Sequence, residues 1–294
     1  MAKVKAVNEV ALDAKKPKKA LKKSIGKYIN PLTDFGFKHI FGTKEYLMDF
    51  LNAVLNIKVA IVDLHYANTV RPGRSEDDRT TVFDLYCTLK NGERILIEMQ
   101  LEPQGFFKPR ILYYGSRLIQ EQGEGNKGDE WDYDLKAVYL VVLANFLFDW
   151  KNKSTDKYIS YILLMDKDTH RIFSRDLTFV LLELPRFVKE ENEIGSKIEE
   201  WMFVLKNLAR LNDLPEKFRT RIFEGLFHKA EIAKLSKEDR QEYDKSVKKL
   251  LDMKALIAEK NRKIEALTQN VTSLTQNVTS LTQSNASLQQ KVAE

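Results

Sequence analysis

The strongest constraint on the fold of this chain is a pair of strand-like runs that are joined at Asn91-Gly92. The first run covers residues 81–90 and the second covers residues 93–101, and each carries an acid in an otherwise apolar stretch, Asp84 and Glu98. An Asn-Gly pair between two such runs is a strong signal for a β-hairpin. A carboxylate in a buried strand costs several kcal/mol unless a partner compensates it. We therefore expect the two acids to be paired or functional.

The type of turn decides whether the two acids meet. A two-residue turn would pair Asp84 with Met99, so that the acids point to opposite faces of the sheet. A three-residue loop, with Gly92 in the left-handed region as a bulge, would instead pair Asp84 with Glu98. The sequence allows both turns, and the acids converge only in the bulged form or with a compensating bulge elsewhere.

If the acids converge, they form a candidate site for a divalent cation. Mg²⁺ prefers hard oxygen ligands, so Asp84, Glu98 and the backbone carbonyl of Met99 are the expected ligands. Such an ion activates a water molecule and shields negative charge on a phosphate. Gln100 shares a strand face with Glu98 and could orient that water. The alternative is that the acids turn outward at a sheet edge or pair with Arg94 or Arg110.

The order of the expected elements indicates a mixed α/β domain with a small sheet, followed by a mostly helical half. We expect a short helix ahead of Gly42, then a helix at 44–56, strands at 59–66, 81–90 and 93–101, a helix at 106–122 and a buried strand at 137–148. Strands at 158–165 and 177–184 and helices at 196–210 and 214–229 follow.

Composition excludes several classes of protein. A single cysteine, Cys87, excludes a disulfide framework and fits a reducing compartment, and its alternation with Asp84 along the strand places it in the core. The longest apolar run, residues 137–148, is too short for a membrane helix, which needs about 20 residues. The four histidines lack metal-ligand spacing, and no phosphate-binding glycine loop is present. We expect a cytoplasmic protein, associated with the nucleoid if it is bacterial.

The net charge of +6 comes from the N-terminus. Residues 1–27 contain nine lysines and two acids, whereas the rest of the chain has 39 basic and 40 acidic residues. We expect a disordered tail, in which the cluster Lys15, Lys16, Lys18 and Lys19 contacts polyanions such as DNA. A merely solvated tail is the alternative.

Heptads at the C-terminus predict a parallel two-stranded coiled coil and hence a homodimer through residues 250–292. The run 268–274 recurs identically at 275–281, with β-branched residues at most a positions and Leu at most d positions. Asn285 occupies an a position and is the residue that would fix the register, because it pairs with another polar group. A disordered polar tail is the alternative, because Thr, Ser and Asn form helices poorly.

Several motifs together resemble the Rpn-type recombination-promoting nuclease and transposase family of the PD-(D/E)XK nuclease superfamily. They are the segments 34–38 (Asp-Phe-Gly-Phe-Lys), 41–42 (Phe-Gly), 83–84 (Phe-Asp), 97–100 (Ile-Glu-Met-Gln), 113–114 (Tyr-Tyr) and 184–187 (Leu-Pro-Arg-Phe). The resemblance spans about residues 28–260. It implies a restriction-endonuclease-like αβββαβ core, with 1–27 as a basic tail, 28–190 as the nuclease-like domain, 191–245 as a helical extension and 246–294 as the coiled coil.

The resemblance also implies roles for individual residues. It assigns metal ligation to Asp84 and Glu98 and gives Gln100 the place that a lysine usually holds in the superfamily. That substitution removes a positive charge, which Lys108, Arg110 or a second metal could supply. Asp34 could add an acid, although helix capping is the simpler role for it.

One face of the helix expected at 106–122 is a candidate DNA contact. At helical spacing this face carries Arg110, Tyr113, Arg117 and Gln120. An exposed polar face without a ligand is the alternative.

The sequence therefore predicts a Mg²⁺-dependent DNA endonuclease of recombination or transposition. The alternative is a catalytically inactive DNA-binding or scaffold protein that oligomerises through its coiled coil.

Overall fold

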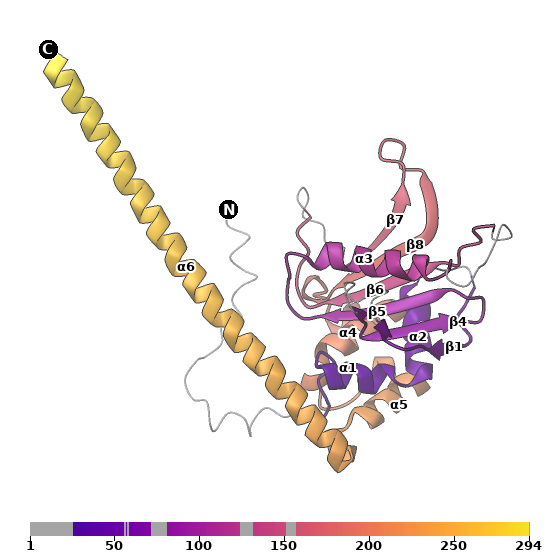
Figure 1. Cartoon of the computed structure of the whole chain (residues 1–294). Coiled ribbons are helices and arrows are strands. Elements are labelled where there is room, and N and C mark those ends of the chain that lie inside the picture. The colour runs from indigo at the N-terminus through magenta and orange to yellow at the C-terminus, as the bar shows by residue number, and fades with distance from the viewer. Residues whose placement is uncertain are drawn as a thin grey trace. The chain divides into compact units, whose positions relative to one another are not determined.

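The computed structural model describes residues 26–55, 57, 59–71, 81–123, 132–150 and 157–293 (Figure 1). Contacts divide the chain into two compact units, one that ends at Arg240 and one that begins at Gln241. The helices are α1 (Asp34–Phe41), α2 (Lys44–Val54), α3 (Phe107–Gln120), α4 (Lys197–Asn207), α5 (Arg221–Ala230) and α6 (Lys237–Ala293). The strands are β1 (Leu64–Tyr66), β2 (Val70–Arg71), β3 (Thr81–Val82), β4 (Leu85–Leu89), β5 (Arg94–Gln100), β6 (Val138–Ala144), β7 (Ile159–Met165) and β8 (Ile172–Glu183).

The first unit is built on a six-stranded sheet with the order β1-β4-β5-β6-β8-β7. Strands β1, β4 and β5 are antiparallel neighbours, whereas β5, β6 and β8 run parallel and β7 returns antiparallel at the edge. Helix α3 forms the crossover between the parallel strands β5 and β6. Strand β6 is covered on both faces, which explains its nearly continuous apolar sequence. The expected mixed α/β architecture is confirmed.

Helices cover both faces of this sheet. Helix α3 lies on one face, and α1, α2, α4 and α5 lie on the other (Figure 1). Gly115 lets α3 approach the sheet closely, because a Cβ atom at this position would lie 2.7 Å from Leu177 and 2.9 Å from Leu140. On the opposite face, Phe41, Phe50 and Trp201 pack with ring centroids 4.9–5.8 Å apart and form the centre of the helical layer.

Two expected strands are shorter in the structure, each because a side chain takes over backbone hydrogen bonds. In the region expected as a strand at 59–66, the strand begins only at Leu64, since the Asn52 amide hydrogen-bonds both the N–H and the carbonyl of Ile61, at 2.7 and 2.9 Å. The run expected at 81–90 is broken at Asp84, and its first part, β3, pairs with β2 in a separate ladder.

The second half also differs from the expected boundaries. Strand β8 starts at Ile172, earlier than the expected 177, because it forms a long hairpin with β7. The helix expected at 214–229 begins at Arg221, where Thr220 caps it by accepting the N–H of Phe223. The helix expected at 196–210 ends at Asn207, and a 3₁₀ turn, Leu208–Arg210, follows it.

Helix α6 is continuous through the repeated heptads. Its threonines are poor helix formers, yet their hydroxyls donate to carbonyls one turn earlier, as Thr268 does to Ile264 and Thr275 to Val271, both at 2.8 Å. The apolar side chains at the a and d positions from Ile264 to Leu288 are 58–63% exposed in the single chain. Within the described residues, no helix is both long enough and apolar enough to span a bilayer.

Candidate active site

The hairpin between β4 and β5 has the three-residue loop that brings the acids together. The N–H of Leu89 donates to the carbonyl of Glu93 at 2.9 Å, and Gly92 has a φ of +87°. Leu85 pairs with Ile97, and the next step along both strands places Asp84 opposite Glu98. The bulged form of the turn is therefore confirmed.

Asp84 and Glu98 are joined through each other's backbone. The Asp84 carboxylate accepts the N–H of Met99 at 2.8 Å, and the Glu98 carboxylate accepts the N–H of Asp84 at 3.4 Å. Glu98 is 6% exposed and Asp84 is half-buried, so neither acid turns outward into solvent. The bond to Met99 also explains why the ladder of β4 stops at Leu85, since the side chain of Asp84 replaces a backbone partner.

The electrostatics of this pair are unfavourable for two bare carboxylates. Burial raises the pKa of Asp84, and burial together with the neighbouring Asp84 charge raises the pKa of Glu98 to about 8. Arg110 lowers both pKa values, and Lys38 lowers that of Asp84, but neither effect reverses the rise. A proton or a cation is therefore needed to balance the second negative charge at neutral pH.

The N-terminal turn of α3 places a cation beside the acids. Arg110 donates from Nη2 to the amide oxygen of Gln100 at 2.6 Å and from Nη1 to that of Gln104 at 2.8 Å. Its guanidinium lies over the rings of Phe107 and Tyr114, at 5.0 and 5.9 Å from their centroids. Gln104 was missed by sequence reasoning, because a lone glutamine in the turn-like segment before α3 carries no motif.

Gln100 does not present a free amide to the acids. Its oxygen accepts from Arg110, and its Nε2 donates to the carbonyl of Glu102 at 2.9 Å. In this structure the Gln100 side chain therefore holds an arginine.

Neither arginine forms the expected alternative ion pair with the acids. Arg94 donates to the carbonyl of Leu118 at 2.8 Å and pairs with Glu121 at 3.5 Å. Within the described part of the chain, no carboxylate lies within ion-pair distance of Arg110.

The other two accessory candidates, Lys108 and Asp34, each contact a partner other than the two acids. Lys108 donates to the carbonyl of Asp149 at 2.7 Å and lies 4.9 Å from the ring centroid of Trp150, so its charge is directed toward the segment after β6. Asp34 is near enough to raise the pKa of Asp84, but it forms an ion pair with Lys38 at 2.8 Å. Asp34 is not the helix cap that we expected, because the cap is Thr33, which accepts the N–H of Gly36.

The face of α3 that we predicted to contact DNA is only partly accessible. Tyr113 and Gln120 are exposed, whereas Arg117 is buried and pairs with Glu121 at 3.8 Å. Arg117 is thus less accessible to a ligand than helical spacing alone indicates. The cluster Lys15, Lys16, Lys18 and Lys19 lies outside the described residues.

The donor set suits a small hard cation held by few protein ligands. The N–H of Met99 donates to Asp84 and therefore points toward that acid. In a β-strand the N–H and the C=O of one residue point to the same neighbouring strand. The Met99 carbonyl therefore also points toward Asp84. Among the described residues, no group of three or more His, Cys, Asp or Glu side chains is placed to hold a metal. The acids are therefore a pair, as in sites where Mg²⁺ keeps several waters.

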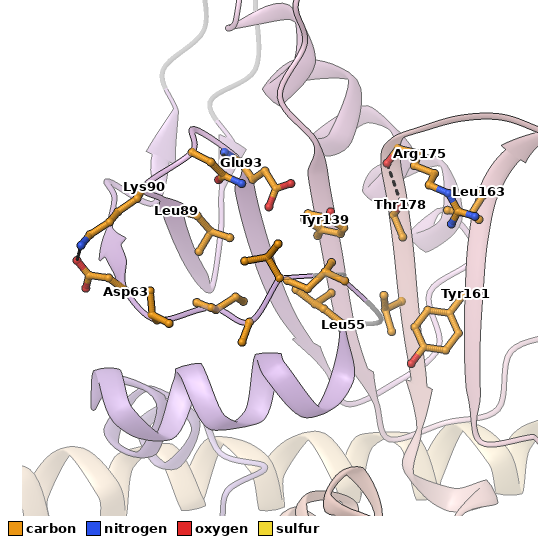
Figure 2. A pocket seen from close by; sticks show the side chains of 17 residues that line it. Leu55, Asp63, Leu89, Lys90, Glu93, Tyr139, Tyr161, Leu163, Arg175 and Thr178 are labelled. Atoms are coloured by element: carbon orange, nitrogen blue, oxygen red, sulfur yellow. Dashed lines mark hydrogen bonds and ion pairs between the residues drawn. The ribbon is translucent and has the colours of Figure 1, made fainter.

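A separate hollow of about 840 Å³ lies on the other face of the sheet (Figure 2). Its lining is mainly apolar and includes Leu55, Leu89, Tyr139, Tyr161 and Val180. None of the predicted site residues that the structure describes lines it, so the acids and this hollow are distinct features.

Comparison with known proteins agrees with the motifs. The model of one family, described as PD-(D/E)XK nuclease family transposase, matches residues 31–260. Comparisons with curated proteins and with solved structures gave no significant match.

Proposed function

Because the chain belongs to the PD-(D/E)XK nuclease family transposases, we propose that it is a metal-dependent DNA endonuclease that acts in recombination or transposition. The observation that carries the proposal is the cross-strand pairing of Asp84 with Glu98 at the end of β5, beside the start of α3. The element order supports it, because α2, β1, β4, β5, α3 and β6 follow one another as in an αβββαβ core with β2 and β3 inserted.

Asp84, Glu98 and the Met99 carbonyl would hold Mg²⁺ or another divalent cation. Such an ion, when bound, lowers the pKa of a coordinated water and offsets negative charge on the phosphate. The chain itself contributes two carboxylates, the buried Glu98 and the half-buried Asp84, which are fixed by the hydrogen bonds that each accepts from the backbone of the opposite strand. Because burial raises the pKa of both carboxyls, a proton competes with the ion for this pair, and metal binding should strengthen as the pH rises.

A plasmid-nicking assay with Mg²⁺ tests this function. Asp84→Asn keeps an oxygen for the N–H of Met99 but removes the charge, so we expect cleavage to fall at least about 100-fold without loss of folding. Asp168→Asn is the matched control, because Asp168 is 86% exposed in the turn between β7 and β8. Unchanged nicking by Asp84→Asn, or nicking by the wild type in EDTA, would contradict the proposal.

The second candidate function is a DNA-binding or scaffold protein without catalysis. It is favoured by the exposed apolar stripe of α6, which we propose mediates a homodimer through residues 250–292. An absence of cleavage by the wild type over a range of divalent ions, with DNA binding retained, would favour this function. In the endonuclease, the same dimer would supply two active sites for the two strands of a duplex.

A further inference from the structure

We propose that Arg110 is the residue that binds the phosphate group at this site, and that Gln100 and Gln104 position it. This inference rests on the proposed function and deepens it, because it supplies the positive charge that a glutamine at position 100 cannot provide. Gln100 thus acts through Arg110 and does not contact the reacting atoms itself.

The first observation is that the charge of Arg110 is not neutralised by an ion pair. Its two terminal nitrogens donate to the neutral amide oxygens of Gln100 and Gln104, at 2.6 and 2.8 Å. Amide oxygens fix the orientation of the guanidinium but leave its full charge available. Arg110 nevertheless lies close enough to lower the pKa of both Asp84 and Glu98.

The second observation is an unused hydrogen-bond donor. The Nε atom of Arg110 is buried, and it has no hydrogen-bond partner in the described part of the chain. Buried donors are rarely left unpaired in folded proteins, so an unpaired one beside a candidate active site indicates a missing acceptor. A phosphate oxygen is the acceptor that matches a guanidinium in both charge and geometry.

The third observation is that the competing cation is engaged elsewhere. Lys108 is two residues away on α3, but its ammonium group bonds the carbonyl of Asp149 and lies over the ring of Trp150. The rings of Phe107 and Tyr114 instead flank Arg110 and limit the directions that its side chain can take. The site therefore favours Arg110 over Lys108.

A charge-relocation experiment tests the proposal. Arg110→Gln should lower the rate of Mg²⁺-dependent plasmid cleavage about 100-fold, the usual effect of removing one donor to a developing charge. Gln100→Lys alone should also lower it, because a lysine there repels Arg110 and removes its acceptor. The double variant Gln100→Lys with Arg110→Gln returns one cation to the site and should cleave at least tenfold faster than Arg110→Gln. Arg110→Lys should retain more activity than Arg110→Gln.

A binding measurement separates this proposal from the nuclease assignment. Fluorescence anisotropy of a labelled 20-base-pair DNA with Ca²⁺ should show at least tenfold weaker binding for Arg110→Gln than for wild type, and a smaller loss for Lys108→Gln. Thermal unfolding of each variant establishes that it is folded. If Arg110→Gln is not folded, Arg110→Met replaces it, because methionine keeps a long unbranched side chain but removes the charge. If the wild type binds but does not cleave, the nuclease assignment fails and the binding comparison still decides the role of Arg110. Wild-type binding and cleavage by a folded Arg110→Gln would overturn the inference.

Discussion

At the scale of single residues, the site is organised by charges that the fold does not neutralise internally. Glu98 is 6% exposed, and burial and the Asp84 charge raise its pKa. Arg110 is also buried in part, yet it is held by amides and not by either acid. The two acids and Arg110 thus form hydrogen bonds to neutral groups and not ion pairs with one another. This arrangement lowers the stability of the fold but leaves the charges available to a charged ligand.

The raised pKa of Glu98 makes a prediction about stability in metal-free buffer. A carboxyl whose pKa is higher in the folded state binds more protons when folded, so its contribution is present below the unfolded pKa and is lost as the pH rises toward about 8. Relative to Glu98→Gln, the wild type should therefore lose free energy of unfolding between about pH 4.5 and pH 8. Urea denaturation at several pH values measures this difference, with the exposed Glu216→Gln as the control. If the free energies of unfolding of wild type and Glu98→Gln changed with pH in the same way, the pKa of Glu98 would not be raised in the folded state.

At the scale of elements, the turn between β4 and β5 determines whether the site exists. Gly92 has a φ of +87°, and an added Cβ would lie 3.1 Å from the Cγ atom of Lys136. We expect Gly92→Ala to lower the free energy of unfolding by about 1–3 kcal/mol, because alanine is strained in the left-handed region. Gly105→Ala, where nothing lies within 4 Å of the added Cβ, should change it by less than about 1 kcal/mol. Equal effects of the two substitutions, measured by urea denaturation, would contradict the role given to the turn.

The main elements of the first unit and the two acids could be predicted from the sequence, because apolar periodicity and an acid within an apolar run can both be recognised in a short segment of the chain. They could not choose between two turns at Asn91-Gly92, since both are compatible with the same residues. The contact between Gln104 and Arg110 depends on how the chain bends between β5 and α3. Helical spacing places Arg117 on one face with Tyr113, but it does not indicate that Arg117 is buried in the packed structure.

At the scale of the whole molecule, α6 carries the prediction of self-association. Between Glu265 and Lys291 the helix has no charged residue, so the apolar a and d positions and Asn285 are what can specify a partner. A second copy in parallel register places Asn285 opposite Asn285, which no slipped register does. A second copy of the same chain is therefore the partner that matches α6 best.

Cysteine cross-linking tests that register. Cys87 is fully buried and burial raises its pKa to about 12, so it contributes little reactive thiol. We expect Leu274→Cys, at a d position, to form an intermolecular disulfide on mild oxidation and Thr272→Cys, on the outer face, to form little. Sedimentation velocity should show a dimer for the wild type and a monomer when the chain ends at residue 245. A monomeric wild type, or equal cross-linking of both variants, would contradict the coiled coil.

The central claim is that Asp84 and Glu98 together hold one divalent cation, and calorimetric titration with Mn²⁺ measures this directly. The account predicts one site per chain in the wild type, at least tenfold weaker binding for Asp84→Asn and for Glu98→Gln, and unchanged binding for Asp168→Asn. Wild-type affinity and stoichiometry in both of the first two variants would contradict it.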